Sequence, residues 1–567
     1  NINEKNVLGE YPRPLMRRKS YVNLNGIWKY AIRETKGFPK KMDGDILVPF
    51  SPEAVLSGVN RQLKPEEYLW YKRRLPDEVK PEKGSRWILH FGAVDQCAVV
   101  YINGKKQGKH VGGYLPFSYD ITEALKEEKN LLTVKVRDYS ETCYYSRGKQ
   151  KLKNGGMFYT AQSGIWQTVW IEKVPECYIG HLKITPLYDQ SSIMIQMEEE
   201  HGIKDIDYEV TITARKMWPV KASGKTGKPC VIMIPHMRSW SPEDPFLYDL
   251  HVRMGEDSVE SYFAMRKVEV KNDKEGIPRI FLNNEPYFEK GVLDQGYWPD
   301  GLYTPPCDEA MIYDIQKMKD LGFNMIRKHI KIEPQRWYYH CDRIGMLVWQ
   351  DMVNGGRDYK SWYVTYMATA MEGMHIRAKD TRIHLMGRQD PTGQKQFESE
   401  MKETIRRLYN HPSVVMYSVG NEIPEFGTDA GAGFCAEISD YIRSMDDTRL
   451  LTCGINGIFI TGDHLDEIVT EILKDSDIKP SGTVNDYLTV MDNYMPELVA
   501  HPVVDENIDK ICALLDVAGY NYMTSRYEAD AVNYPDRVMV GSETYPPQIA
   551  KNWEIIKRTD SCLLYTS

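Results

Sequence analysis

The chain has 567 residues, of which 42% are hydrophobic and 27% are charged, and its formal net charge is −8. This composition is typical of a globular protein, and the length predicts several domains. The negative charge argues against a nucleic acid or an anionic membrane as partner, and no apolar run approaches the roughly 20 residues of a membrane span.

Cysteine usage and the first residues leave the cellular compartment open. The ten cysteines are scattered without CxxC pairs, which favours buried free thiols and a reducing compartment. The N-terminal residues lack the apolar core of a signal peptide. The chain is therefore expected in the cytoplasm or, if a leader was removed, in the periplasm or outside the cell.

Two all-β regions are predicted first. In residues 1–173, short alternating runs at 86–92, 97–104 and 131–138 are separated by turn residues such as Asn103-Gly104. This pattern predicts a two-sheet β-sandwich. Residues 174–270 continue with runs at 181–188, 208–215 and 247–254, and their number and length predict an immunoglobulin-like sandwich.

Strands and helices alternate from residue 271 to residue 567, which predicts an α/β barrel. Seven strands are expected, at 287–294, 324–330, 346–352, within 411–422 after a short loop, and at 449–456, 517–522 and 537–543. The last residues, CLLYTS, resemble a translated sequencing adapter, so we expect a C-terminally truncated barrel that lacks its last βα unit. Two insertions, at about 353–395 and 458–510, are expected on the catalytic face.

Polar residues follow three of these apolar strands. Residues 411–422 (HPSVVMYSVGNE) end in Asn421 and Glu422, and residues 537–543 (RVMVGSE) end in Glu543. Between them, VAGYNY ends in Tyr522. Catalytic side chains of α/β barrels sit at this end of the strands, and two carboxylates there suit a glycosidase. The alternative for each carboxylate is a cap on the following helix.

With these motifs the chain resembles glycoside hydrolase family 2, the group of β-galactosidases, β-glucuronidases and β-mannosidases. The resemblance extends over nearly the whole chain. It rests on GNE, on the later SE and on three N-terminal runs, YVNLNGIWKY (21–30), GGYLPFSYDIT (112–122) and SGIWQTVWIE (163–172). It implies a jelly-roll sugar-binding sandwich, an immunoglobulin-like sandwich and a catalytic TIM barrel.

The resemblance also implies roles for five residues. Glu422 matches the acid/base and Glu543 the nucleophile. Asn421 matches the residue that binds the sugar 2-hydroxyl, and Tyr522 the tyrosine that hydrogen-bonds the nucleophile. Arg327 matches an arginine that helps to keep the nucleophile ionised. The alternatives are an ordinary ion pair for Arg327 and a core tyrosine for Tyr522.

Five further residues are weaker candidates. Asp294 and Asp351 close the first and third strands and are candidates to hold sugar hydroxyls, and Trp298 and Trp349 are candidate stacking walls. Each has a structural role as its alternative. His329 lies in RKHIKIEP, which departs from the family's usual run, so it is left between a site residue and a packed histidine. No metal and no cofactor is assigned.

The expected function is that of a retaining exo-β-glycosidase which hydrolyses terminal β-linked sugars by double displacement. β-Galactosides are the leading substrates, and β-glucuronides and β-mannosides are the alternatives within the family. The Asn-x-Lys signature of the family's glucuronidases is not visible after Glu543. The rival class is a non-catalytic carbohydrate-binding protein. The expected partner is an oligosaccharide or glycoside, and a homo-oligomer stays open.

Overall fold

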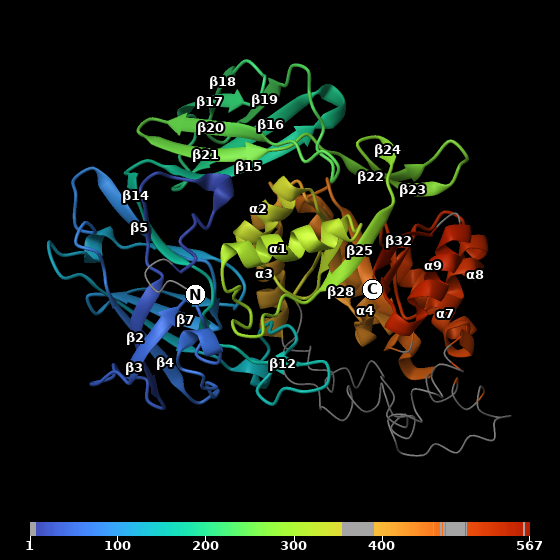
Figure 1. Cartoon of the computed structure of the whole chain (residues 1–567), viewed down its shortest axis with the longest axis horizontal. Helices are drawn as coiled ribbons and strands as arrows, with labels where there is room; N and C mark the ends of the chain where they lie inside the picture. Colours follow the sequence, from blue (N-terminus) through green and yellow to red (C-terminus); the bar gives the residue numbers. More distant parts are fainter. Residues whose placement is uncertain are drawn as a thin grey trace.

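The computed structural model describes residues 7–353, 391–457, 459–464, 468, 471, 494, 496–559 and 562–566. Two β-sandwiches precede a parallel α/β barrel, as the sequence predicts. The first sandwich lies beside the barrel, and the second lies across both of them (Figure 1).

The first sandwich consists of a six-stranded and a four-stranded sheet. Side chains alternate between core and solvent along its strands: in β2, Trp28 is 1% exposed and its neighbour Ile27 is 43% exposed. The six-stranded sheet has the order β3 (Gly44–Val48), β2 (Gly26–Arg33), β4 (Tyr68–Arg74), β10 (Leu131–Arg137), β7 (Cys97–Ile102) and β8 (Lys105–Val111). The four-stranded sheet has the order β1 (Tyr21–Asn23), β14 (Val169–Pro175), β5 (Ser85–Phe91) and β9 (Phe117–Asp120).

Two short ladders and a second sandwich complete the β part of the chain. The ladders pair β6 (Val94–Asp95) with β13 (Gly164–Ile165), and β11 (Gln150–Lys151) with β12 (Tyr159–Thr160). The second sandwich packs β15 (Ile179–Leu187), β16 (Ser192–Glu199) and β19 (Pro229–Met233) against β18 (Val220–Lys225), β17 (Asp207–Thr213), β20 (Tyr248–Met254) and β21 (Asp257–Phe263). A small sheet of β22 (Val268–Asn272), β23 (Pro278–Leu282) and β24 (Glu285–Pro286) then leads into the barrel.

The six barrel strands between residues 325 and 543 are buried on both faces, which explains their nearly continuous apolar sequences. Every residue of β28 is buried, for example. The ring runs through β25 (Glu289–Asp294), β26 (Met325–Lys328), β27 (Leu347–Asp351), β28 (Val414–Asn421), β29 (Leu450–Asn456), β30 (Ala518–Asn521), β31 (Met539–Glu543) and β32 (Cys562–Thr566).

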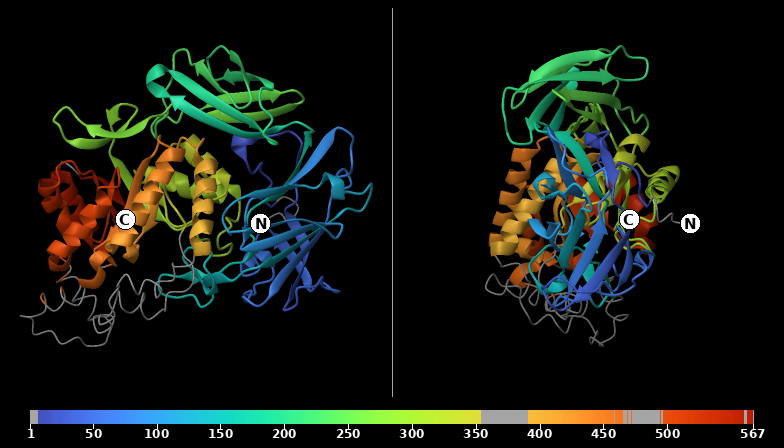
Figure 2. Two further views of the ribbon diagram at one scale, coloured as in Figure 1. Left: turned by 180° about the vertical axis from the view of Figure 1, so that it is seen from behind. Right: turned by 90° about the vertical axis from the view of Figure 1, so that its left-hand side faces the viewer.

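Amphipathic helices cover the outside of the ring (Figure 2). In α4, Cys435, Ile438 and Ile442 are buried, and the Thr428 hydroxyl caps the first turn by accepting from the Gly431 amide at 3.1 Å. The described helices are α1 (Asp308–Asp320), α2 (Gln335–Ile344), α3 (Pro391–Leu408), α4 (Asp429–Met445), α7 (Pro502–Cys512), α8 (Tyr527–Asn533) and α9 (Ile549–Arg558).

The structure differs from the sequence prediction at the eighth strand. All seven predicted strands form in the predicted order, but the place expected to be empty is taken by β32. This strand pairs in parallel with β31 on one side and with β25 on the other. Two open strand edges facing each other offer unpaired backbone groups to any extended segment that reaches them.

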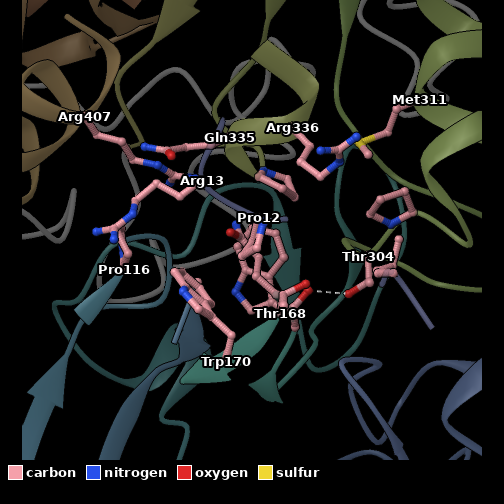
Figure 3. A pocket seen from close by; sticks show the side chains of 16 residues that line it. Pro12, Arg13, Pro116, Thr168, Trp170, Thr304, Met311, Gln335, Arg336 and Arg407 are labelled. Atoms are coloured by element: carbon pink, nitrogen blue, oxygen red, sulfur yellow. Dashed lines mark hydrogen bonds between the residues drawn. The ribbon is translucent and has the colours of Figure 1, made fainter. Parts of the chain in front are cut away.

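Buried contacts tie the three parts together. Arg18 bridges the two sandwiches, because it donates to Glu172 at 3.1 Å and to Asp257 at 2.8 Å. The first sandwich meets the barrel around a cavity of about 60 Å³ (Figure 3). At its edge, Thr304 of the barrel donates to the Trp166 carbonyl of the sandwich at 2.7 Å. The close packing around so small a cavity holds the first sandwich in a defined position against the barrel.

Most of the two predicted insertions lies outside the described residues, so the structure does not test them. Within the described part of the chain, no helix has the length and apolarity that crossing a membrane requires.

Candidate active site

Side chains from five strands meet at one rim of the barrel. Arg327, Asp351, Asn421, Tyr522 and Glu543 lie at or next to the carboxyl ends of β26, β27, β28, β30 and β31. Parallel strands in a closed ring all end at the same rim, so residues far apart in the sequence come together there.

Arg327 is the centre of this group and has no exposed surface. Its Nε donates to both carboxylate oxygens of Asp351 at 3.1 Å, and its Nη2 donates to Asn421 Oδ1 at 2.8 Å. Its Nη1 donates to Glu543 Oε1 at 3.2 Å and to the Ser542 carbonyl at 3.1 Å. A buried guanidinium is costly unless it is fully paired, and here two carboxylates and two neutral oxygens pair it.

Two of the weaker candidates, Trp349 and Asp351, contact Arg327. Trp349 is 0% exposed, and its ring lies 4.5 Å from the Arg327 guanidinium carbon. A tryptophan without exposed surface cannot stack on a sugar, so Trp349 acts on the site through Arg327. Asp351 is also 0% exposed, and its oxygens bind Arg327 and His329, which leaves it out of reach of sugar hydroxyls.

Replacing Asp351 by Ala is expected to destabilise the barrel by about 3–5 kcal/mol, because it leaves the buried charge of Arg327 short of one partner. Denaturant unfolding monitored by fluorescence measures this loss. The matched control is Asp45→Ala, which removes the partner of Lys29 in an exposed ion pair and should cost less than about 1 kcal/mol. Equal losses for the two variants would contradict the expectation.

His329 belongs to the same group, although its sequence context left its role undecided. Its Nδ1 lies 2.7 Å from Asp351 Oδ2, and its Nε2 lies 3.9 Å from Glu543 Oε1. Burial lowers the pKa of the imidazole, although Asp351 acts in the opposite direction. Among the described residues, Nε2 has no hydrogen-bond partner, so it can donate or accept a further hydrogen bond at the rim.

Glu543 is held in its ionised form. The Tyr522 hydroxyl donates to its Oε2 at 2.8 Å, while Arg327 occupies its Oε1. Burial would raise the pKa of Glu543, but His329 and Arg327 outweigh burial and the pKa lies below its ordinary value. Lys149, from the first sandwich, and the Tyr522 hydroxyl act in the same direction.

Glu422 is in the opposite electrostatic situation. Burial, and next the negative charge of Glu543, raise the pKa of Glu422 to about 7. Two amides donate to its Oε1, from Asn456 at 2.8 Å and from Asn521 at 3.1 Å. These neutral donors orient the carboxyl group without supplying the positive charge that would ionise it.

The backbone is strained just beyond three of the strands. Ile330, Glu422 and Tyr522 have φ values of 52°, 49° and 58°, in the left-handed region that side chains other than glycine rarely adopt. Such strain costs of order 1–3 kcal/mol per residue, and it collects at functional sites, where the surrounding structure enforces it.

The sequence analysis missed Asn456 and Asn521. Both end strands that were correctly predicted, at GIN and at YNY, so the polar strand tip was the available signal. Asn521 also links the two halves of the site, because its Nδ2 donates to Asn421 Oδ1 at 3.1 Å and its Oδ1 accepts from Ser542 at 2.5 Å.

Asp294 and Trp298 stand apart from this contact network. Asp294 accepts from Lys328 and from the Gly296 amide, each at 2.7 Å. Burial would raise its pKa, but Lys328 holds it below its ordinary value. Trp298 is half-buried beyond β25, where its backbone pairs with Leu302.

The arrangement combines a carboxyl group that can keep its proton near neutral pH with a carboxylate that stays charged. Asn521 donates to Glu422 and lies opposite Glu543 where β30 pairs with β31, so the two carboxyl groups share one site. Within the described residues, no three His, Cys, Asp or Glu side chains are grouped so that they could hold a metal ion.

Comparisons with known proteins match both ends of this architecture. The family model for the sugar-binding domain of glycosyl hydrolases family 2 matches residues 59–175. The model for the TIM barrel domain of the same family matches residues 307–500. Together the two matches extend over more than half of the chain.

The relatives found by sequence are named for two different enzyme activities. A β-glucuronidase of Felis catus is 24% identical over 78% of this chain and 69% of its own length. A β-galactosidase of Thermoanaerobacter pseudethanolicus is 24% identical over 71% of this chain and 51% of its own length. The chain thus spans about half the length of several curated relatives that it matches.

Solved structures share the fold. A β-glucuronidase from an uncultured Clostridium species superposes with a TM-score of 0.69 at 19% identity, over 97% of this chain and 91% of the other. A β-galacturonidase of Eisenbergiella tayi bound to galacturonate gives a TM-score of 0.65 at 17% identity, over 98% and 91%.

Proposed function

This chain belongs to glycoside hydrolase family 2, and on that premise we propose that it is a retaining exo-β-glycosidase. The observation that carries the proposal is the contrast between two carboxyl groups at one rim, because Glu422 accepts from the neutral amides of two asparagines and Glu543 accepts from the guanidinium of Arg327. The pKa of Glu422 is raised to about 7 and that of Glu543 is lowered. Double displacement needs such a pair, one carboxyl group protonated and the other ionised.

In the first step, Glu543 attacks the anomeric carbon of the terminal sugar while Glu422 gives its proton to the leaving oxygen. The bond to the aglycone breaks, and a covalent glycosyl-enzyme forms on Glu543. Arg327 and the Tyr522 hydroxyl keep the attacking carboxylate charged before this step. The Arg327 contact also fixes the Asn421 amide, which is proposed to bind the sugar 2-hydroxyl.

In the second step, Glu422 has lost its proton and acts as a base toward a water molecule. The water attacks the anomeric carbon, its proton passes to Glu422, and the bond to Glu543 breaks. When Glu543 becomes esterified, its negative charge disappears. The pKa of Glu422 then falls, so the same group can act as an acid in the first step and as a base in the second. For this geometry, the carboxyl groups of a retaining pair are expected about 5–5.5 Å apart.

A panel of nitrophenyl β-glycosides tests the reaction and its substrate. β-Galactosides are the leading candidates from the sequence, and the relative named β-galactosidase supports them. Hydrolysis with retention, followed by NMR of the first product formed, is the expected result. A protein that binds these glycosides but cleaves none of them would instead be the carbohydrate-binding alternative.

β-Glucuronides are the second candidate substrates. The relative and the structural neighbour named β-glucuronidase favour them as directly as the other relative favours galactosides. The panel therefore includes the matched pairs of glucuronide with glucoside and of galacturonide with galactoside, which differ only in the charge at C6.

The pH dependence of kcat/KM should have a descending limb near pH 7. Glu422 must carry its proton in the first step, and its pKa is about 7, so activity is lost as the pH rises through that value. The acidic limb reports protonation of Glu543, which stops its attack. This limb should lie below the ordinary titration range of a glutamate, because the pKa of Glu543 is lowered. Initial rates on a nitrophenyl glycoside across the pH range measure both limbs.

A dinitrophenyl leaving group provides the control for this profile, because it departs without a proton. Its kcat/KM reports only the first step, so the descending limb should flatten while the acidic limb stays. A descending limb of equal depth on both substrates would assign it to a group other than Glu422.

A further inference from the structure

A loop of the first sandwich reaches the rim of the barrel. It contains β11 and β12, and it extends from the sandwich toward the barrel (Figure 1). Tyr159 of this loop stacks on Tyr297 of the barrel, with ring centres 3.7 Å apart and planes 11° from parallel. Tyr297 lies in the segment that follows β25, so the contact fixes the loop over the catalytic side of the ring.

The loop is also anchored next to Lys149. Gln150 is buried, and its side-chain amide donates to Asp95 and to the Tyr114 hydroxyl, each at 3.3 Å. Gly148 has a φ of +63°, and a Cβ there would lie 3.0 Å from the Ile330 carbonyl of the barrel. Only glycine permits this approach without strain, so the chain on both sides of Lys149 has a fixed course.

The ammonium group of Lys149 acts on both glutamates of the site. Its charge favours the ionised forms of Glu422 and of Glu543. Ile330, against which its neighbour Gly148 packs, comes directly after His329, whose ring faces Glu543. Among the described residues, no carboxylate lies within ion-pair distance of Lys149, in contrast to Arg327, Lys328 and Lys331.

We propose that Lys149 is a specificity residue of the active site, supplied by the sandwich domain, and that it binds the carboxylate of a uronic acid substrate. Lys149 is half-buried and has no ion-pair partner in the described part of the chain. Its ammonium group would gain a charge-assisted hydrogen bond from such a sugar, whereas a neutral hexose offers it only a hydroxyl. The inference rests on the proposed glycosidase function and narrows its substrate class.

The test compares Lys149→Met with wild type on the two matched substrate pairs. We expect kcat/KM to fall by about 10- to 100-fold on the preferred uronide and to change less than about twofold on its neutral counterpart, since a hydrogen bond to a charged group contributes roughly 1.5–3 kcal/mol. Lys149→Arg should keep part of the uronide activity. Lys153→Met, an exposed lysine of the same loop, is the control and should leave both rates unchanged.

Two results would overturn the inference. An equal fall on uronide and neutral glycoside, with a shifted descending pH limb, would mean that Lys149 only adjusts the charge of the glutamates. Unchanged uronide activity would remove Lys149 from the site. If wild type cleaves no glycoside, the proposed function fails, and calorimetry decides the inference alone: free glucuronate or galacturonate should bind wild type and lose about 10- to 100-fold in affinity with Lys149→Met.

Discussion

Replacing Glu543 by Ala is expected to reduce hydrolysis of every β-glycoside by on the order of 10⁵-fold, whatever the leaving group. Without the carboxylate, no glycosyl-enzyme can form. The loss therefore appears equally with dinitrophenyl and with alkyl glycosides, and no burst of leaving group precedes turnover. Stopped-flow and steady-state rates on both kinds of substrate measure it.

External azide identifies what the Glu543 variant has lost. The cavity left by the side chain admits azide from the face of the missing carboxylate, so direct displacement should yield the α-glycosyl azide, with inverted configuration. Glu528→Ala is the matched control, because that glutamate is exposed on α8 and pairs with Arg558. Retention of more than about a hundredth of wild-type activity by the Glu543 variant would place the nucleophile elsewhere.

The strand tips were predictable from the sequence because at each of them an apolar run changes abruptly to polar residues. An apolar run that ends in Asn-Glu, Ser-Glu or Asn-Tyr marks both the end of a buried strand and a polar group at the rim. The same rule pointed to Asp351, whereas Arg327 was named from the family resemblance. It could not separate a rim residue that faces substrate from one that supports another side chain, which is how Trp349 came to be named as a stacking wall.

Contacts between distant segments could not be predicted in the same way. Asn456 and Asn521 donate to one oxygen of Glu422 because the ring places β28, β29 and β30 side by side in that order, and no local pattern records that neighbourhood. Lys149 is a stronger case. It lies in a different domain, and contacts between that domain and the barrel, such as the stacking of Tyr159 on Tyr297 and the close approach at Gly148, bring it to the barrel.

The eighth strand illustrates the limit of strand prediction by pattern. Cys562–Thr566 has too few residues for its alternation to be distinguished from a loop. Its resemblance to a translated sequencing adapter also offered another explanation. In the structure, the hydrogen-bonding edges of β31 and β25 determine its conformation. Pairing supplied by neighbours can therefore make a strand of a segment whose own sequence gives little indication.

Replacing Glu422 by Ala should produce a loss that depends on the leaving group. A poor leaving group needs the proton of Glu422, so alkyl glycosides should lose on the order of 10²- to 10⁴-fold. A dinitrophenyl group departs unaided, so the first step should survive and release a burst of one leaving group per site. The second step then becomes slow, because no base activates the attacking water. Glu422→Gln keeps an oxygen that accepts from Asn456 and Asn521, and it should show the same kinetics as Glu422→Ala.

Azide should rescue the Glu422 variant in a different way from the Glu543 variant. It needs no base, so it attacks the glycosyl-enzyme formed on Glu543 and speeds turnover of the dinitrophenyl substrate. Two inversions leave the product as the β-glycosyl azide, which NMR distinguishes from the α-product. Glu437→Ala, an exposed change on α4, controls for general effects on the barrel. An α-azide from the Glu422 variant together with a β-azide from the Glu543 variant would reverse the two assignments, since the configuration records which carboxylate carried the sugar.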